Sequence, residues 1–149
     1  MPNEALFAYG TLRDPDVLAR VLGHPVAAGR LRPAMAPDCQ VVFFPCRTYP
    51  ALRQSPGASA PGTLIEGLSD VDLLALDAFE GDEYRRGKIE VRVDGAAESA
   101  AVYWPAVAIE AGLEWRFEDW LARHKPAFLA DETADTAAWR AQLTAMRNE

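Results

Sequence analysis

The chain has 149 residues, half of them hydrophobic, which is enough for one buried core and short of what two domains usually need. A formal net charge of −7, with basic residues interspersed among acids, argues against a nucleic-acid surface and favours a small molecule as partner. No apolar stretch reaches the roughly 20 residues of a membrane span, and no basic segment precedes the first apolar run. We therefore expect one domain over residues 1–149 in a soluble, cytoplasmic protein; its oligomeric state is left open.

The N-terminal part of the chain predicts a short buried strand followed by a short helix. Ala5–Tyr9 is uniformly apolar and too short for an amphipathic helix, which favours a buried strand. Asp14 is a typical N-cap, Pro15 suits the first helical position and Gly23 suits the stop. We therefore expect Val17–Leu22 to be helical.

The segment that follows is punctuated by Pro and Gly. Its predicted strands or extended pieces are Val26–Leu31, Gln40–Phe44, Tyr49–Leu52 and Thr63–Leu68. Between the last two, Ser55–Gly62 consists entirely of Ser, Pro, Gly and Ala, which predicts a solvent-exposed loop.

A helix and a hairpin are predicted next. Ser69–Asp72 fits a capping box ahead of the apolar run Leu73–Phe79. Lys88–Val93 then alternates strictly, Asp94–Gly95 is a typical hairpin turn, and Ala100–Trp104 is the expected return strand.

The C-terminal part of the chain, residues 113–147 approximately, is predicted to be helical and to pack on the rest of the domain. One helical face would carry aromatic and apolar residues: Trp115, Phe117, Trp120 and Leu121. A second helical run is expected at Thr136–Met146. The order of elements indicates an α+β domain with a mostly antiparallel sheet, either open or closed into a barrel.

Several kinds of chemistry find no support in the sequence. His24 and His124 have no acid or thiol at ligand spacing, so neither predicts a metal site. Cys39 and Cys46 fit neither a disulfide framework nor a redox pair, and we expect both to be buried thiols. Gly10 is followed by no second glycine at nucleotide-loop spacing. We therefore expect no metal ion and no cofactor.

The loop after the first strand is a candidate binding loop. Its glycine, Gly10, allows close approach of a ligand to the backbone, and successive N–H groups in such a turn can hold a small anion. An ordinary strand-to-helix turn fits this segment equally well.

Glu80 is the candidate acid/base residue. It follows Phe79 near the apolar face of the predicted helix, where desolvation would raise its pKa toward neutrality. The alternative is a solvated glutamate that pairs with Arg85 or Arg86. Tyr84 is expected either beside Glu80 or in the core, and the neighbouring acids are expected to be solvated: Asp77, Asp82 and Glu83.

A set of segments spread along the chain carries a family resemblance. These segments are Phe7–Leu12, Tyr49–Leu52, Gly67–Leu68, Leu76–Gly81, Tyr84–Arg85, Val102–Tyr103 and Trp115–Trp120. Because of the order and spacing of these segments, the chain resembles the γ-glutamylcyclotransferase-like superfamily. Within it, the chain resembles the AIG2-like branch that includes γ-glutamylamine cyclotransferases.

The resemblance implies a fold, an activity and a site. The fold is a small mixed, mostly antiparallel β-barrel with flanking α-helices. The activity, of acyltransferase or lyase type, releases 5-oxoproline from a γ-glutamyl amine or peptide when the substrate's α-amine attacks its γ-carbonyl. Glu80 matches the family's acid/base glutamate, and the expected substrate-binding residues are Tyr9, Gly10, Thr11, Leu12 and Tyr84.

Two other kinds of function stay open at this point. The same pocket can serve a non-catalytic small-molecule-binding or stress-response module. A third possibility is an interaction protein that uses its C-terminal aromatic residues. The sequence does not identify the amine that would leave.

Overall fold

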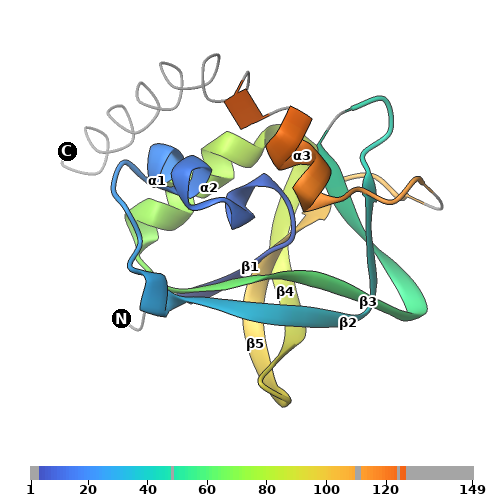
Figure 1. The fold of residues 1–149 in the computed structure, drawn as a ribbon, viewed down its shortest axis with the longest axis horizontal. Helices are drawn as coiled ribbons and strands as arrows, with labels where there is room; N and C mark the ends of the chain where they lie inside the picture. Colours follow the sequence, from blue (N-terminus) through green and yellow to red (C-terminus); the bar gives the residue numbers. More distant parts are fainter. Residues whose placement is uncertain (1–3, 48, 110–111, 124, 127–149) are drawn as a thin grey trace.

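The computed structural model describes residues 4–47, 49–109, 112–123 and 125–126 (Figure 1). The strands are β1 (Glu4–Ala8), β2 (Leu31–Phe43), β3 (Pro50–Leu68), β4 (Tyr84–Val93) and β5 (Ala96–Pro105). The helices are α1 (Pro15–Leu22), α2 (Asp70–Glu80) and α3 (Phe117–Arg123), with 3-10 turns η1 (Thr11–Arg13), η2 (Ala28–Arg30) and η3 (Gly81–Glu83).

The strands form a ring in the order β1-β3-β2-β4-β5. Neighbouring strands are antiparallel, except that β1 and β5 are parallel. Two junctions of the ring rest on one aligned residue pair each, Leu6 with Ala101 and Met35 with Arg92. The α+β fold with a mixed, mostly antiparallel sheet is therefore confirmed, as a ring of strands less regular than a clean barrel.

The predicted loop Ser55–Gly62 is wrong, because these residues lie within β3, and Ser59–Gly62 pair with β2. The small side chains of this segment allow β3 to pack closely against its neighbours. Ala60 is buried, and a Cβ on Gly62 would lie 2.6 Å from the Phe7 ring and 2.5 Å from the Ala8 carbonyl oxygen. Close approach of β1 to β3 therefore requires a glycine at position 62.

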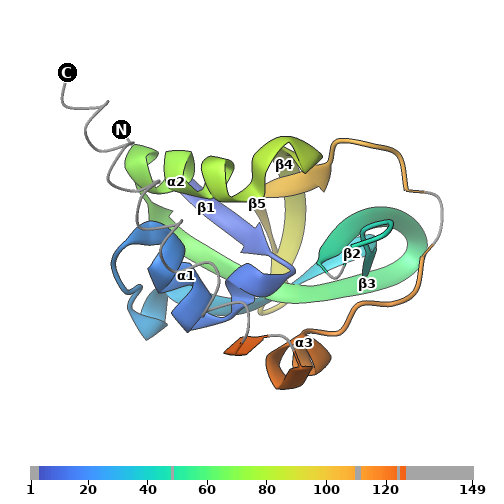
Figure 2. The ribbon, with the colours of Figure 1, turned by 90° about the horizontal axis from the view of Figure 1, so that it is seen from above.

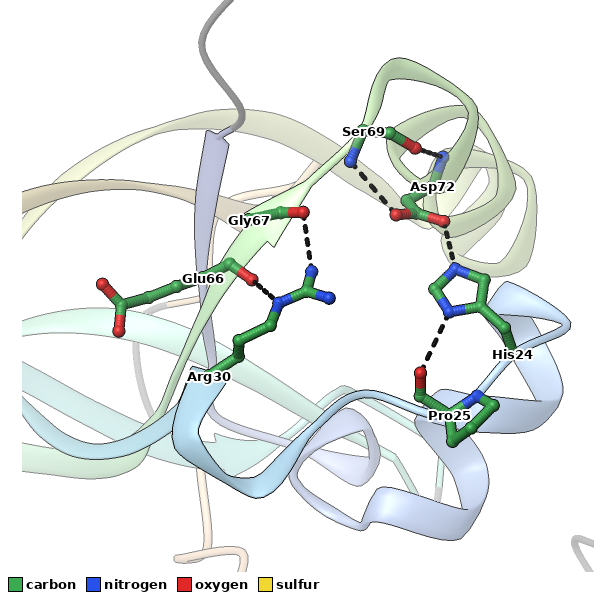
Figure 3. Close-up of polar contacts among 7 residues, drawn as sticks. All are labelled: His24, Pro25, Arg30, Glu66, Gly67, Ser69 and Asp72. Carbon is green, nitrogen blue, oxygen red and sulfur yellow. Dashed lines mark hydrogen bonds and ion pairs between the residues drawn. The ribbon is translucent and has the colours of Figure 1, made fainter.

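The predicted strand at Val26–Leu31 is also wrong. Only Leu31 lies in a strand, because Ala28–Arg30 forms the turn η2. The Arg30 guanidinium donates from Nε to the Glu66 carbonyl at 2.7 Å and from Nη2 to the Gly67 carbonyl at 2.6 Å (Figure 3). These contacts with the end of β3 hold the turn, and local propensity could not show them.

The other predictions for the first helix and the hairpin are confirmed, with small shifts of their boundaries. The Asp14 carboxylate accepts from the Val17 N–H at 3.1 Å, and Gly23 ends α1 with a φ of 81°. Asp94 and Gly95 both have positive φ, as a tight hairpin turn between β4 and β5 requires. Gln40–Phe43 is extended as predicted, but its strand β2 begins at Leu31.

Helices α1 and α2 pack against each other beside the ring (Figure 2). Ser69 and Asp72 form the predicted capping box at the start of α2. His24, just after α1, places Nε2 2.8 Å from Asp72 Oδ1 and Nδ1 3.1 Å from the Pro25 carbonyl (Figure 3). His24 thus joins the end of one helix to the start of the next, which is a structural role.

The C-terminal prediction is tested only in part. Trp115 and Trp120 are buried, and α3 begins at Phe117. The second run, Thr136–Met146, and His124 lie outside the described residues. Within the part of the chain that the structure describes, no helix has the length and apolar character needed to cross a bilayer.

Candidate active site

A cavity of about 250 Å³ lies where the end of β1, the turn η1, the end of α2 and the start of β4 meet. All six residues predicted to form the site line this cavity: Tyr9, Gly10, Thr11, Leu12, Glu80 and Tyr84. Segments separated by some seventy residues of chain are thus brought together around one space.

The Gly10 loop is built by close packing. A Cβ on Gly10 would lie 2.7 Å from Cγ of Pro50, so no larger residue fits without displacing the start of β3. The next three residues form the 3-10 turn η1, in which the Arg13 N–H donates to the Gly10 carbonyl at 3.1 Å. The N–H groups of Thr11 and Leu12 begin this turn and have no partner within it, and both residues line the cavity.

Glu80 is the last residue of α2. Gly81 ends the helix with a φ of 70° and donates its N–H to the Asp77 carbonyl, which a residue with a side chain would do only under strain. Glu80 is half-buried in the cavity wall, and desolvation of its carboxyl, with the nearby Asp77 charge, raises its pKa to about 8. Glu80 is therefore poised to exchange a proton near neutral pH.

Three tyrosines lie near enough to interact electrostatically with Glu80: Tyr9, Tyr84 and Tyr103. Tyr9 donates to the Tyr103 carbonyl at 2.6 Å, and Tyr84 donates to the Pro50 carbonyl. Burial raises the pKa of Tyr9, Tyr84 and Tyr103 above that of an ordinary tyrosine. These hydroxyls therefore stay protonated and neutral while Glu80 titrates.

Two acids predicted to be solvated have partners instead. Asp77 accepts from the Tyr103 hydroxyl at 2.7 Å and lies 3.6 Å from Nη1 of Arg86. Glu83 lines the cavity and accepts from the Tyr49 hydroxyl. Only Asp82 is exposed as predicted.

Cavity residues that the sequence-based prediction missed include Tyr49, Pro50, Glu83, Tyr103 and Trp120. Tyr49, Pro50, Tyr103 and Trp120 lie in segments that carried the family resemblance, which was a usable signal. Glu83 had no such signal beyond its place in an acidic run.

The cysteine prediction is half right. Cys39 is buried, but Cys46 is exposed in a turn and has a φ of 61°. Among the residues that the structure describes, no three His, Cys, Asp or Glu side chains gather closely enough to hold a metal ion.

Comparisons with known proteins agree on one family. The family model described as "Gamma-glutamyl cyclotransferase, AIG2-like" matches residues 6–122. AIG2-like protein A of Arabidopsis thaliana is 30% identical over 128 residues, which is 83% of this chain and 76% of the relative. Protein AIG2 B of the same plant is 30% identical over 133 residues, 86% of this chain and 76% of the relative.

Solved structures show the same fold. A solution structure of an Arabidopsis thaliana protein matches with a TM-score of 0.66 at 26% identity, covering 87% of this chain and 88% of that one. A structure of a gamma-glutamyl cyclotransferase matches with a TM-score of 0.60 at 18% identity, covering 70% and 67%. With its fold and most of its length matched, the chain belongs to the AIG2-like gamma-glutamyl cyclotransferase family.

Proposed function

We propose that this protein releases 5-oxoproline from a γ-glutamyl amine or γ-glutamyl peptide. The observation that carries the proposal is that Glu80 and the Gly10 loop line one cavity. A proton acceptor and a set of backbone donors are the two parts that this reaction needs from a protein, because the substrate carries its own nucleophile.

In the proposed reaction the substrate's α-amine nitrogen attacks its γ-carbonyl carbon and closes a five-membered lactam. Glu80 takes a proton from the ammonium group and later returns one to the leaving nitrogen as the carbon–nitrogen bond breaks. A desolvated site favours this first transfer, since it converts a carboxylate and an ammonium into two neutral groups. Folding the substrate into reactive geometry contributes on the order of 7–11 kcal/mol in well-oriented intramolecular reactions.

The Gly10 loop would hold the α-carboxylate of the substrate. Of the described residues that line the cavity, none is Lys, Arg or His, so backbone N–H groups are the donors available to an anion. The N–H groups of Thr11 and Leu12 suit this role. Tyr9 would complete the wall behind them.

Gly10→Ala tests this assignment. The added Cβ would meet the Pro50 ring at about 2.7 Å, so the loop must shift and its N–H groups move relative to Glu80. We expect KM to rise about tenfold or more with a smaller change in kcat, as measured by steady-state kinetics. An unchanged KM in a folded Gly10→Ala protein would remove the loop from substrate binding.

Glu83 would set the preference for the leaving amine. Its carboxylate accepts from Tyr49 and lies 3.4 Å from Nε of Arg47, and it is the second acid on a wall of the cavity. The Glu83 carboxylate favours a neutral or cationic leaving amine over one that carries a further carboxylate.

This preference predicts a ratio of kcat/KM. We expect kcat/KM to be about tenfold higher for γ-glutamyl derivatives of a diamine than for γ-glutamyl amino acids. In Glu83→Gln the ratio of the two kcat/KM values should fall to within about threefold of unity. The comparison uses both substrates at equal ionic strength. A ratio that Glu83→Gln leaves unchanged would assign the preference to another residue.

The reaction itself is tested by incubating the protein with a panel of γ-glutamyl amines and dipeptides and measuring 5-oxoproline. Glu80→Gln is the inactive control. If no compound reacts but some raise the melting temperature, a binding module replaces the enzyme.

A further inference from the structure

A second cavity, of about 220 Å³, shares Tyr9 with the first. Its walls come from the turn η1, from β2 and β3, and from the segment that leads into α3. The backbone N–H of Trp115 donates to the Val41 carbonyl at 3.1 Å, which fixes that segment along the edge of β2. At roughly 30 Å³ per water molecule, the space holds a small organic molecule.

Arg13 is the notable residue in this wall. Its Nε is buried and has no hydrogen-bond partner among the described residues. The guanidinium lies over the Phe117 ring, with Cζ 4.5 Å from the centroid. Desolvation lowers the pKa of Arg13, but a guanidinium remains charged throughout the physiological range. A charged guanidinium whose Nε has no hydrogen-bond partner among the described residues therefore lines this cavity.

The other residues that line the cavity define which kind of ligand could bind beside the Arg13 guanidinium. Gln40 accepts through Oε1 from Nη1 of Arg53 at 3.0 Å, which leaves its NH₂ group as a donor, and the Ser59 hydroxyl is also in the wall. Trp115 and Phe117 supply flat apolar surfaces with ring centroids 6.5 Å apart. The combination suits a molecule with a planar apolar body and one anionic end.

The acids in the wall limit the charge of the ligand. Glu114 is paired with Arg116, whose Nε lies 3.0 Å from Oε1 of Glu114. Glu118 forms no ion pair among the described residues and lies near enough to interact with the Arg13 charge. A monoanion such as a carboxylate is therefore favoured over a phosphate dianion, which Glu118 would repel more strongly.

We propose that this second cavity is a binding site for a small organic carboxylate, with Arg13 as the residue that holds the carboxylate and Trp115 and Phe117 as the walls around its apolar body. The site is separate from the cavity of Glu80, with which it shares Tyr9, and binding there requires no turnover.

The two cavities can be followed separately because a different tryptophan lines each of them. Trp120 lines the first and Trp115 the second, so their indole N–H resonances in the full-length protein report each site. Trp115→Phe and Trp120→Phe assign the two signals. The probes are benzoate and its neutral analogue benzamide.

We expect benzoate to shift the Trp115 signal in a saturable manner, and benzamide to bind at least about tenfold more weakly. Arg13→Met replaces the charged group with an unbranched apolar side chain and should weaken benzoate binding by at least about tenfold. Glu118→Gln removes the competing charge and should strengthen it by about two- to fivefold. Arg123→Met, an exposed arginine of α3 outside the cavity, is the matched control and should have no effect.

Equal binding of benzoate and benzamide at Trp115 would overturn the proposal, as would a response confined to Trp120. If Arg13→Met fails to fold, Arg13→Lys takes its place: it keeps the charge, loses the planar fork and should weaken benzoate binding by a smaller factor. Benzoate binding that neither variant changes would also contradict the assignment. The activity of the protein toward γ-glutamyl compounds does not enter any of these outcomes.

Discussion

Glu80→Gln should reduce kcat for 5-oxoproline release by about 10²–10⁴-fold, the usual contribution of a positioned general acid/base. Glutamine has nearly the same shape and can still form hydrogen bonds, but it cannot accept the ammonium proton. The Gly10 loop lies on a separate segment and keeps its donors, so KM should change by only a few-fold. Residual turnover would come from the geometry imposed on the substrate.

The matched control for this substitution is Asp82→Asn. Asp82 lies two residues beyond Glu80 in the same acidic run but is exposed. The control removes a carboxylate from the same surface and should leave kcat within about twofold of the parent protein. A kcat reduced by less than about tenfold in a folded Glu80→Gln protein would remove Glu80 from the mechanism, whether or not the product is 5-oxoproline.

Local signals were sufficient for the elements whose ends are set by their own residues. The Asp14 side chain caps the start of α1, and Gly23 ends the helix in a left-handed conformation. Asp94 and Gly95 form the hairpin turn through their positive φ angles. The wrong secondary-structure predictions fall on segments whose conformation depends on contacts with residues far away in the sequence. Gly62 lies in β3 opposite Ala34 of β2, where a side chain on it would collide with the Phe7 ring of β1.

The site was predictable to the extent that its residues had an unusual local setting. Glu80 stood out as an acid beside an apolar helix face, and the Gly10 loop as a glycine after a buried strand. The structure brings both to one cavity, which the sequence pattern alone left open. Glu83 and Arg13 look like ordinary surface charges in the sequence, and only the burial and the partners of their side chains distinguish them.

The pH dependence of kcat/KM should show an acid limb centred near pH 8. Glu80 must be ionised to accept the ammonium proton, and its pKa is raised to about 8 by desolvation and by Asp77. The ionised fraction of such a group falls about tenfold for each pH unit below its pKa, so kcat/KM should drop roughly 50-fold between pH 8 and pH 6. Steady-state rates at low substrate concentration measure this directly.

Asp77→Asn is the variant that tests the cause of this limb. The substitution removes the negative charge of Asp77, which is the smaller of the two causes that raise the pKa of Glu80. The acid limb should therefore move to lower pH by less than about one unit, because desolvation of Glu80 remains. A limb near pH 4.5 in the parent protein would show that Glu80 is solvated, and an unmoved limb in Asp77→Asn would show that the Asp77 charge is screened.

Thermal stability gives an independent measurement of the same ionisation. The unfolded chain loses the Glu80 proton near pH 4.5 and the folded protein retains it to about pH 8. Folding therefore takes up a proton between these values, and this group's contribution to stability falls as pH rises through that window. Glu80→Gln removes the ionisable group, so its melting temperature should match that of the parent protein at pH 4 and exceed it by about 10 °C at pH 8.5. Equal melting temperatures at both pH values would mean that Glu80 has an ordinary pKa, and the acid limb would then belong to another group.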